Sequence, residues 1–169
     1  MTSGGPGPAA GFTSFLDLLA VHGELEELFL LHQEALVALD VVTAQMRLQK
    51  YQQALARHIA DEEELLIPVY RRARPVAGGA VVLFLAEHHK MLEMIATFQR
   101  DLEHMDEPAS GLVRRIIALV DEQATFKRLM EHHDLREHNI LYPSLDGVTD
   151  EAERRELLTK CLDHRLHPA

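Results

Sequence analysis

Two stretches of the sequence repeat one pattern of metal-binding residue types. Each has a glutamate four residues after a histidine and a proline ten residues after it: His58, Glu62 and Pro68, then His133, Glu137 and Pro143. On a helix, residues i and i+4 share a face with Cβ atoms ~5–6 Å apart, so imidazole and carboxylate can reach the same metal ion. A carboxylate can also bridge two ions. The repeat therefore predicts a two-metal site, and its ligand types suit iron, manganese or zinc.

The His-x-x-x-Glu spacing alone is weak evidence, because such pairs are common on solvated helix faces. His22 with Glu26 and His89 with Glu93 have the same spacing. The apolar run and proline that both long motifs share are much harder to obtain by chance. A ferritin-like carboxylate site is disfavoured, since no glutamate has a histidine three residues later.

These residues must be positioned by helices, because apolar residues recur with helical periodicity over four long segments. The predicted helices cover residues 14–39, 43–68, 79–105 and 111–141, and a short one covers 150–163. Thr13 or Ser14 is the expected N-cap, Pro68 should kink or end the second helix, and the fourth should stop before Pro143. A turn is expected at Asp146–Gly147. The short breaks (40–43, 74–79 and 106–111) favour an all-α, antiparallel up-down-up-down four-helix bundle with a short C-terminal helix.

Helix register identifies two further ligands. In antiparallel helices, residues at one height lie equally far from the intervening turn. Matching the middle of the second-helix motif with His22 puts the turn in the predicted 40–43 break, whereas His32 would put it inside helical sequence. Counting residues from the two later turns in the same way places His88 at the same height in the bundle as both motifs. One layer of the bundle is therefore predicted to contain His22, His58, Glu62, His88, His133 and Glu137.

Other polar residues near this layer are weaker candidates. His89 is rotated by ~100° from His88 around the helix, and Glu63 and His138 occupy equivalent places in the two motifs. These three are kept as further candidate ligands, with Glu63 and His138 favoured as residues that orient a ligand. For His32, the register predicts a buried hydrogen bond with Tyr51. Four other histidines, at helix ends, in the tail or at the surface, need no special role: His104, His132, His164 and His167.

Size and composition set the remaining limits. A chain of 169 residues suits one domain, here a leader at 1–13, a bundle at 14–145 and a C-terminal helix and tail at 146–169. The net charge of −10 argues against a nucleic-acid partner. No apolar stretch is long enough to span a bilayer, and no signal peptide is recognisable. Cys161 is the single cysteine, which fits a reducing compartment, so we expect a cytoplasmic protein without a membrane partner.

The sequence resembles the hemerythrin-like, HHE cation-binding family over residues 15–145. The matching text is His-Gly-Glu-Leu-Glu from His22, the two long motifs, and Ala-Glu-His-His around His88. The resemblance implies an antiparallel four-helix bundle with a nonheme diiron centre. The four predicted histidines would be terminal ligands, and Glu62 and Glu137 would be the carboxylate bridges.

Two departures argue against reversible oxygen carriage. Oxygen carriers of the family have a second histidine four residues further along the third helix, where this chain has Leu92. Their fourth-helix carboxylate comes five residues after its histidine, a place that His138 holds here. We therefore expect two iron ions, with zinc or manganese as alternatives, at a site that binds or senses dioxygen, nitric oxide, peroxide or iron. A diiron oxidoreductase acting on peroxide or NO and a metal-dependent regulatory module are the alternatives, and a homodimer is left open.

Overall fold

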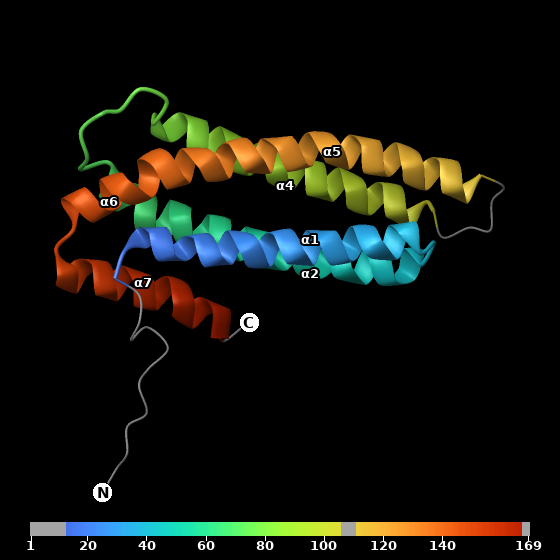
Figure 1. The fold of residues 1–169 in the computed structure, drawn as a ribbon, viewed down its shortest axis with the longest axis horizontal. Coiled ribbons are helices and arrows are strands. Elements are labelled where there is room, and N and C mark those ends of the chain that lie inside the picture. Colours follow the sequence, from blue (N-terminus) through green and yellow to red (C-terminus); the bar gives the residue numbers. More distant parts are fainter. Residues whose placement is uncertain (1–12, 106–110, 167–169) are drawn as a thin grey trace, which may run out of the picture.

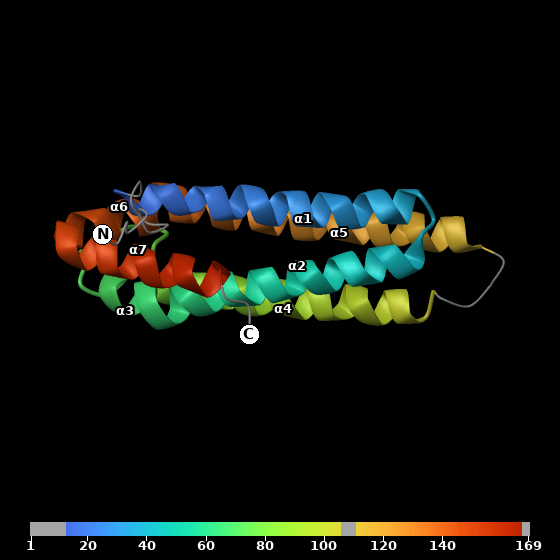
Figure 2. The same ribbon diagram turned by 90° about the horizontal axis from the view of Figure 1, so that it is seen from below.

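The computed structural model describes residues 13–105 and 111–166, with side chains as far as Leu162. Within those ranges every regular element is a helix. Four long ones lie side by side as a helical bundle (Figures 1 and 2): α1 (Leu19–Val37), α2 (Val41–Asp61), α4 (Val81–Glu103) and α5 (Leu112–Arg136). α1 packs against α2 and α5, and α4 packs against the same two helices. The predicted leader and the 106–110 part of one predicted break lie outside the described residues, apart from Thr13.

Side-chain caps start α2 and the 3₁₀ turn that leads into α1. Ser14 caps a 3₁₀ turn (Phe15–Leu18) that leads into α1: its hydroxyl accepts from Leu16 N at 3.1 Å, and its own N–H donates to Asp17 Oδ2 at 3.1 Å. Asp40 caps α2 by accepting from Thr43 N at 3.0 Å. The predicted N-cap at Ser14 is therefore correct. The turn between α1 and α2 occupies residues 38–40, slightly earlier than predicted.

Neither proline ends its helix. The prediction that the fourth helix stops before Pro143 is therefore wrong, and of the two effects expected at Pro68, a kink or an end, the helix does not end there. Each proline is preceded by one π-helical segment, η2 (Glu62–Leu66) before Pro68 and η3 (Glu137–Leu141) before Pro143. In these segments the N–H of Ile67 donates to Glu62 O and that of Tyr142 to Glu137 O, five residues back. The wider turn accommodates a residue that lacks an N–H and whose ring would clash inside an α-helix.

The helices continue beyond the prolines as α3 (Ile67–Tyr70) and α6 (Tyr142–Val148). The predicted Asp146–Gly147 turn is wrong for the same reason, because both residues lie inside α6. The actual turn follows at Thr149–Asp150, where Asp150 Oδ1 accepts from Glu153 N at 2.9 Å.

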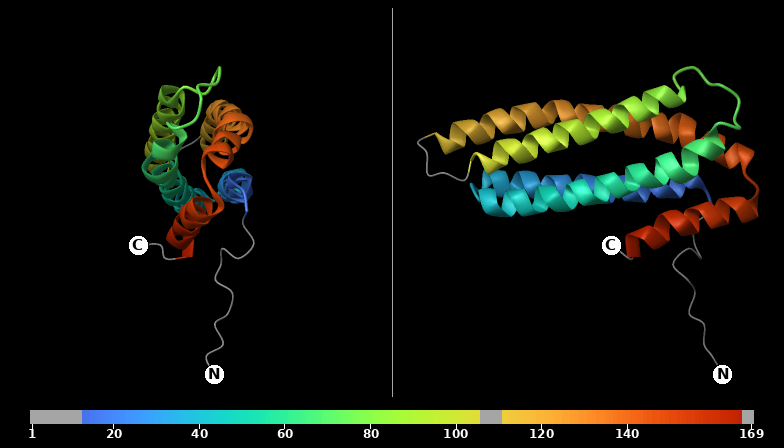
Figure 3. Two further views of the ribbon diagram at one scale, coloured as in Figure 1. Left: turned by 90° about the vertical axis from the view of Figure 1, so that its left-hand side faces the viewer. Right: turned by 180° about the vertical axis from the view of Figure 1, so that it is seen from behind.

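The C-terminal helix α7 (Glu151–Leu166) lies outside the four long helices and runs beside α2 (Figure 3). It packs against α2 and η2, and its inner face buries Leu157, Leu158, Cys161 and Leu162. Among the described residues, no helix is both long enough and apolar enough to cross a membrane.

Candidate metal centre

The six residues of the predicted layer come together inside the bundle. Five of them are at most 7% exposed, and the side chain of His58 is 9% exposed. Their ligand atoms form two groups, and within each group all atoms lie within 4.8 Å of one another. The first group is His22, His58, Glu62 and Glu137, and the second is His88, His133, Glu62 and Glu137.

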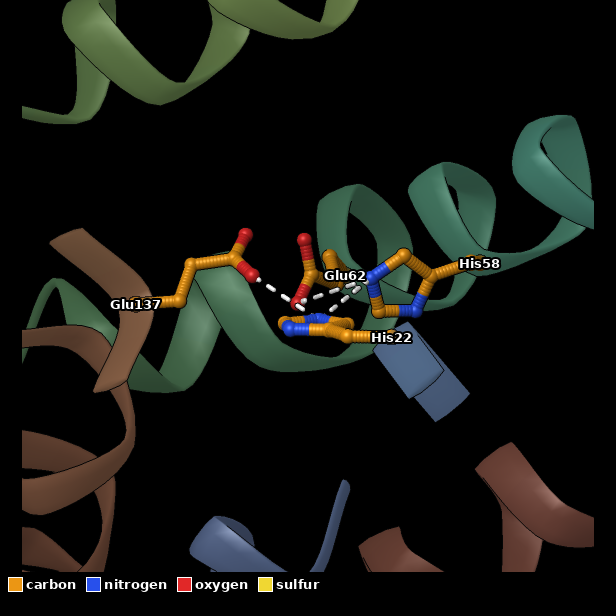
Figure 4. A group of neighbouring side chains, drawn as sticks. All are labelled: His22, His58, Glu62 and Glu137. Carbon is orange, nitrogen blue, oxygen red and sulfur yellow. Dashed lines mark hydrogen bonds and ion pairs between the residues drawn. The ribbon is translucent and has the colours of Figure 1, made fainter. Parts of the chain in front are cut away.

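The first group lies between α1, α2 and the two π-helical segments (Figure 4). His22 Nε2 is 3.1 Å from His58 Nε2 and 3.1 Å from Glu137 Oε2. His58 Nε2 is 3.7 Å from Glu62 Oε1. Two imidazoles and two carboxylate oxygens therefore face one small volume.

The second group uses the other oxygen of each carboxylate. His88 Nε2 is 3.2 Å from Glu62 Oε2 and 3.9 Å from Glu137 Oε1, and His133 Nε2 is 2.6 Å from Glu137 Oε1. Both glutamates thus divide their oxygens between the two histidine pairs. This is the geometry needed for a carboxylate that bridges two ions.

Tyr142 contributes a hydroxyl to this layer of the bundle. Its O–H donates to Glu62 Oε1 at 2.7 Å and lies 3.3 Å from Glu137 Oε2 and 3.2 Å from His22 Nε2. The π-helix explains its position, because five residues make about one π turn and so bring Tyr142 onto the face of Glu137. The signal in the sequence was the proline after Tyr142, whose effect on the preceding turn we did not predict.

Outer carboxylates hold two of the histidine rings. Nδ1 of His88 donates to Glu63 Oε1 at 2.9 Å, and Nδ1 of His133 donates to Glu87 Oε2 at 3.0 Å. Glu87 is itself held by Arg136, whose Nη2 donates to Glu87 Oε1 at 2.9 Å. A carboxylate that accepts a hydrogen bond from Nδ1–H fixes the ring orientation, so that the lone pair of Nε2 can point at a metal.

Glu87 was missed by the sequence analysis, although it immediately precedes His88. It points instead to the ring of His133 on α5. Asp134 was missed as well, and its Oδ1 lies 3.5 Å from Nδ1 of His22. Helix periodicity within one segment cannot show such contacts between helices.

The remaining sequence candidates lie away from the two groups. His89 is 75% exposed and its Nε2 pairs with Glu93 Oε1 at 3.1 Å, and His132 and His138 are also exposed. The side chains of His164 and His167 lie outside the described residues. His104, at the end of α4, is exposed and bonds to Arg100 O.

His32 is fully buried, but its predicted bond to Tyr51 is wrong. Its Nδ1 donates to Ala44 O at 2.8 Å, and its Nε2 accepts from Gln123 Nε2 at 2.9 Å. Both ring nitrogens are therefore used by neighbours other than Tyr51, which packs against Phe29 and Phe126.

For most of the ligands, the neighbouring charges counteract the effect of burial on the side-chain pKa values. Burial alone would lower the pKa of His88, but the carboxylates of Glu137 and Glu62 outweigh it and raise the pKa to about 9. The pKa of His133 is likewise raised to about 10, against burial, chiefly by the charge of Glu137. Burial would raise the pKa of Glu137, yet the charge of His133 holds it well below its usual value. Burial lowers the pKa of His58, which favours the neutral ligand form.

The residues fit a metal because four buried ligand atoms of the second group converge on one another. These atoms are Glu62 Oε2, His88 Nε2, His133 Nε2 and Glu137 Oε1, and within the described residues none of them has an assigned hydrogen bond. Their close contacts are the His88–Glu62 and His133–Glu137 ion pairs, at 3.2 Å and 2.6 Å, which require a protonated ring. A cation coordinated by all four atoms would replace those ring protons, and mixed imidazole and carboxylate ligands suit iron, manganese or zinc.

A pocket of about 470 Å³ reaches the first group from one side of the bundle. It lies between α1, α2 and α7, and its lining includes His58, Glu62 and Cys161. Of the first group, His58 and Glu62 line this pocket, so the pocket adjoins the centre.

Comparison with known families agrees with this geometry. The family model described as "Hemerythrin HHE cation binding domain" matches residues 15–145. The chain belongs to the hemerythrin HHE cation-binding family. No curated protein and no solved structure matches the chain with significant similarity. The family match covers every residue of the two ligand groups, whereas α7, which supplies Cys161 to the pocket, lies beyond it. An HHE domain implies cation binding, and the buried His/Glu groups are suited to hold the cations.

Proposed function

We propose that the protein binds two iron ions between the two histidine pairs, within an antiparallel up-down-up-down bundle. In this proposal Glu62 and Glu137 bridge the ions, and His22, His58, His88 and His133 are terminal ligands. The observation that supports it is the division of both buried carboxylates, one oxygen toward each histidine pair.

The ligand count also suggests a role for the site. Two imidazoles and two carboxylate oxygens per ion leave positions open for water or for a small exogenous ligand. We infer that the protein binds or senses dioxygen, nitric oxide or peroxide, or senses iron itself. Bound iron would supply one-electron and dioxygen chemistry. The chain's own residues bind the ions, orient the imidazoles and exclude most water.

Metal analysis of protein produced in iron-replete cells tests this proposal. We expect two metal ions per chain in the wild type and at most one in Glu62→Ala and Glu137→Ala. Glu93→Ala is the matched control, because Glu93 is exposed and outside the site. Fewer than one metal per wild-type chain would overturn the proposal. Absorption spectra of anaerobic iron-loaded protein, before and after oxygen and azide, would report on open coordination.

A second candidate is a diiron oxidoreductase that acts on peroxide or NO. Two observations favour it: the 470 Å³ pocket at His58 and Glu62, and the Tyr142 hydroxyl within hydrogen-bond reach of both carboxylates. This hydroxyl can orient a polar ligand at the first group. Steady consumption of peroxide or NO by iron-loaded protein, slowed in Tyr142→Phe with unchanged metal content, would support turnover. Binding of peroxide or NO without its consumption would instead support the sensing role.

A further inference from the structure

The Tyr142 hydroxyl lies among the atoms that the first ligand group offers to a metal ion. Its oxygen is 2.7 Å from Glu62 Oε1, 3.3 Å from Glu137 Oε2 and 3.2 Å from His22 Nε2. All three residues belong to the first group. The Tyr142 side chain is fully buried, so these ligand atoms, rather than bulk solvent, surround its hydroxyl.

The separations are those expected between neighbouring ligands of one ion. Bonds from a metal such as zinc to histidine nitrogen or carboxylate oxygen are about 2.0–2.2 Å long, so two ligands at a right angle lie about 3 Å apart. Pairs of ligand atoms within the first group are spaced similarly, since His22 Nε2 is 3.1 Å from both His58 Nε2 and Glu137 Oε2. The Tyr142 oxygen is therefore placed like a fifth ligand of this group.

A residue that only orients a ligand approaches this site from a different side. Glu87, for example, contacts Nδ1 of the His133 ring, whereas Nε2 of the same ring faces Glu137. Tyr142 instead lies beside Nε2 of His22, which is the nitrogen that faces the other first-group ligands. Its position is thus that of a group bound to the ion rather than of a group behind a ligand.

Only one of the two repeated motifs provides such a hydroxyl. Tyr142 lies five residues after Glu137 and directly before a proline, and the corresponding residue after Glu62 is Ile67, which has no polar side-chain atom. Within the described residues, the four ligand atoms of the second group likewise have no assigned hydrogen bond. The two ions are therefore expected to differ in their ligands.

We propose that Tyr142 is itself a ligand of the ion in the first group and binds it through the phenolate oxygen. The inference rests on the proposed function, because it requires an ion between the two carboxylates. The hydroxyl proton is released to solvent as the metal–oxygen bond forms, and Tyr142 fills one of the coordination positions left open at this ion.

The hydrogen bond of the metal-free fold agrees with this assignment. Burial and the charges of Glu137 and Glu62 raise the pKa of Tyr142, so without metal the hydroxyl keeps its proton and donates to Glu62. A cation bound beside the oxygen reverses this balance, because its positive charge stabilises the phenolate.

Resonance Raman spectroscopy of the full-length, iron(III)-loaded protein tests the proposal. A phenolate bound to iron(III) gives a visible charge-transfer band, and excitation within that band enhances the vibrations of the tyrosinate ring. The wild type should show both signals, and ring-deuterated tyrosine should shift the vibrations. At iron concentrations that keep both sites filled, Tyr142→Phe should lose both signals. A hydroxyl that only donates a hydrogen bond to Glu62 gives neither.

The other tyrosines of the chain provide matched controls. There are three in all, and neither Tyr51 nor Tyr70 belongs to a ligand group. Tyr51 is buried against Phe29 and Phe126, and the Tyr70 hydroxyl donates to Gly79 O at 2.7 Å. Tyr51→Phe and Tyr70→Phe should therefore keep the charge-transfer band at wild-type intensity.

Two results would overturn the inference: iron(III)-loaded wild type without tyrosinate vibrations, or a tyrosinate band that persists in Tyr142→Phe. If Tyr142→Phe does not fold, the wild-type spectrum and the two control variants still decide the question. Iron content, measured on the same samples, separates this failure from failure of the metal site. A chain without iron contradicts the proposed function, whereas an iron-loaded chain without tyrosinate signals contradicts only the assignment of Tyr142.

Discussion

Glu62 and Glu137 each begin a π-helical segment. Each of these glutamates directs one carboxylate oxygen to the His22–His58 pair and the other to the His88–His133 pair. The π turn lies between the glutamate and the proline in both motifs. The sequence repeat is therefore also a repeat of local backbone geometry. Because i+5 comes onto the face of i in a π turn, this geometry also brings Tyr142 to the carboxylates.

The choice of His22 over His32 predicts different behaviour for two alanine variants. His22→Ala should lower the metal content from two ions to one or fewer, because its Nε2 faces the first group. His32→Ala should keep both ions but lower the free energy of unfolding by about 1–3 kcal/mol, because Ala44 O and the Gln123 amide lose their partner. Metal analysis and urea unfolding check both. Loss of metal in His32→Ala alone would contradict the assignment.

Glu87 should act on the metal through His133. Glu87→Ala removes the carboxylate that holds Nδ1 of His133, so metal affinity should fall by about 10–100-fold. Glu87→Gln should recover part of the loss, because its amide oxygen can still accept from Nδ1. Competition with a chromophoric chelator measures the affinity. Glu93→Ala, which removes an exposed carboxylate of the same helix, should leave it unchanged.

Metal binding should release protons and strengthen as the pH rises. In the metal-free fold the pKa values of His88 and His133 are raised to about 9 and about 10, so both rings are protonated at pH 7. A metal must displace these protons, and apparent affinity should rise by up to about tenfold per pH unit for each proton released, between pH 7 and 9. Calorimetry in buffers of different ionisation enthalpy counts the protons. Affinity independent of pH would exclude this linkage.

The same shifts predict how stability of the metal-free protein depends on pH. A raised pKa means that the folded state binds protons more tightly than the unfolded state, whose histidines titrate near 6.5. The stabilisation from His88 and His133 is thus fully present below about pH 6.5 and is lost as the pH rises through 9–10. Urea unfolding of the chelator-treated protein from pH 6 to 10 should show this fall. A rise in stability over that range would show that other groups dominate.

Removing the metal should lower the melting temperature. A ligand at 100 times its Kd stabilises the fold by about 2.7 kcal/mol, which for a domain of this size is a shift on the order of 5–10 °C. Differential scanning calorimetry with and without chelator measures it. His22→Ala, with less metal to lose, should show a smaller shift. Equal melting temperatures of loaded and metal-free wild type would exclude a regulatory role based on metal-dependent stability.

Gly79 and Gly23 should respond in opposite ways to alanine. A Cβ on Gly79 would lie 2.5 Å from the Tyr70 hydroxyl and 2.7 Å from Ile140 Cγ2, and that hydroxyl donates to Gly79 O. Gly79→Ala should therefore cost about 1–3 kcal/mol. Gly23 is an exposed helical residue, and a Cβ added to it would meet no atom within 4 Å, so Gly23→Ala should raise the free energy of unfolding by about 0.5–1 kcal/mol. Urea unfolding of metal-free protein compares the two.

The sequence by itself determined the helices and the layer of six residues. Apolar periodicity and short breaks are local properties. The repeated motif identifies His58, Glu62, His133 and Glu137, and helix register adds His22 and His88. Local sequence was less informative at Pro68 and Pro143, because the effect of proline depends on whether the preceding turn can widen. A π turn there keeps each helix going.

Tertiary structure alone decided which side chains meet across helices. Glu87 reaches His133 rather than its neighbour His88, and Gln123 rather than Tyr51 bonds to His32. Such contacts depend on the rotation and separation of packed helices, which sequence spacing along one helix does not specify. The pocket beside His58 has the same origin, since residues of α1, α2, η2 and α7 line it together.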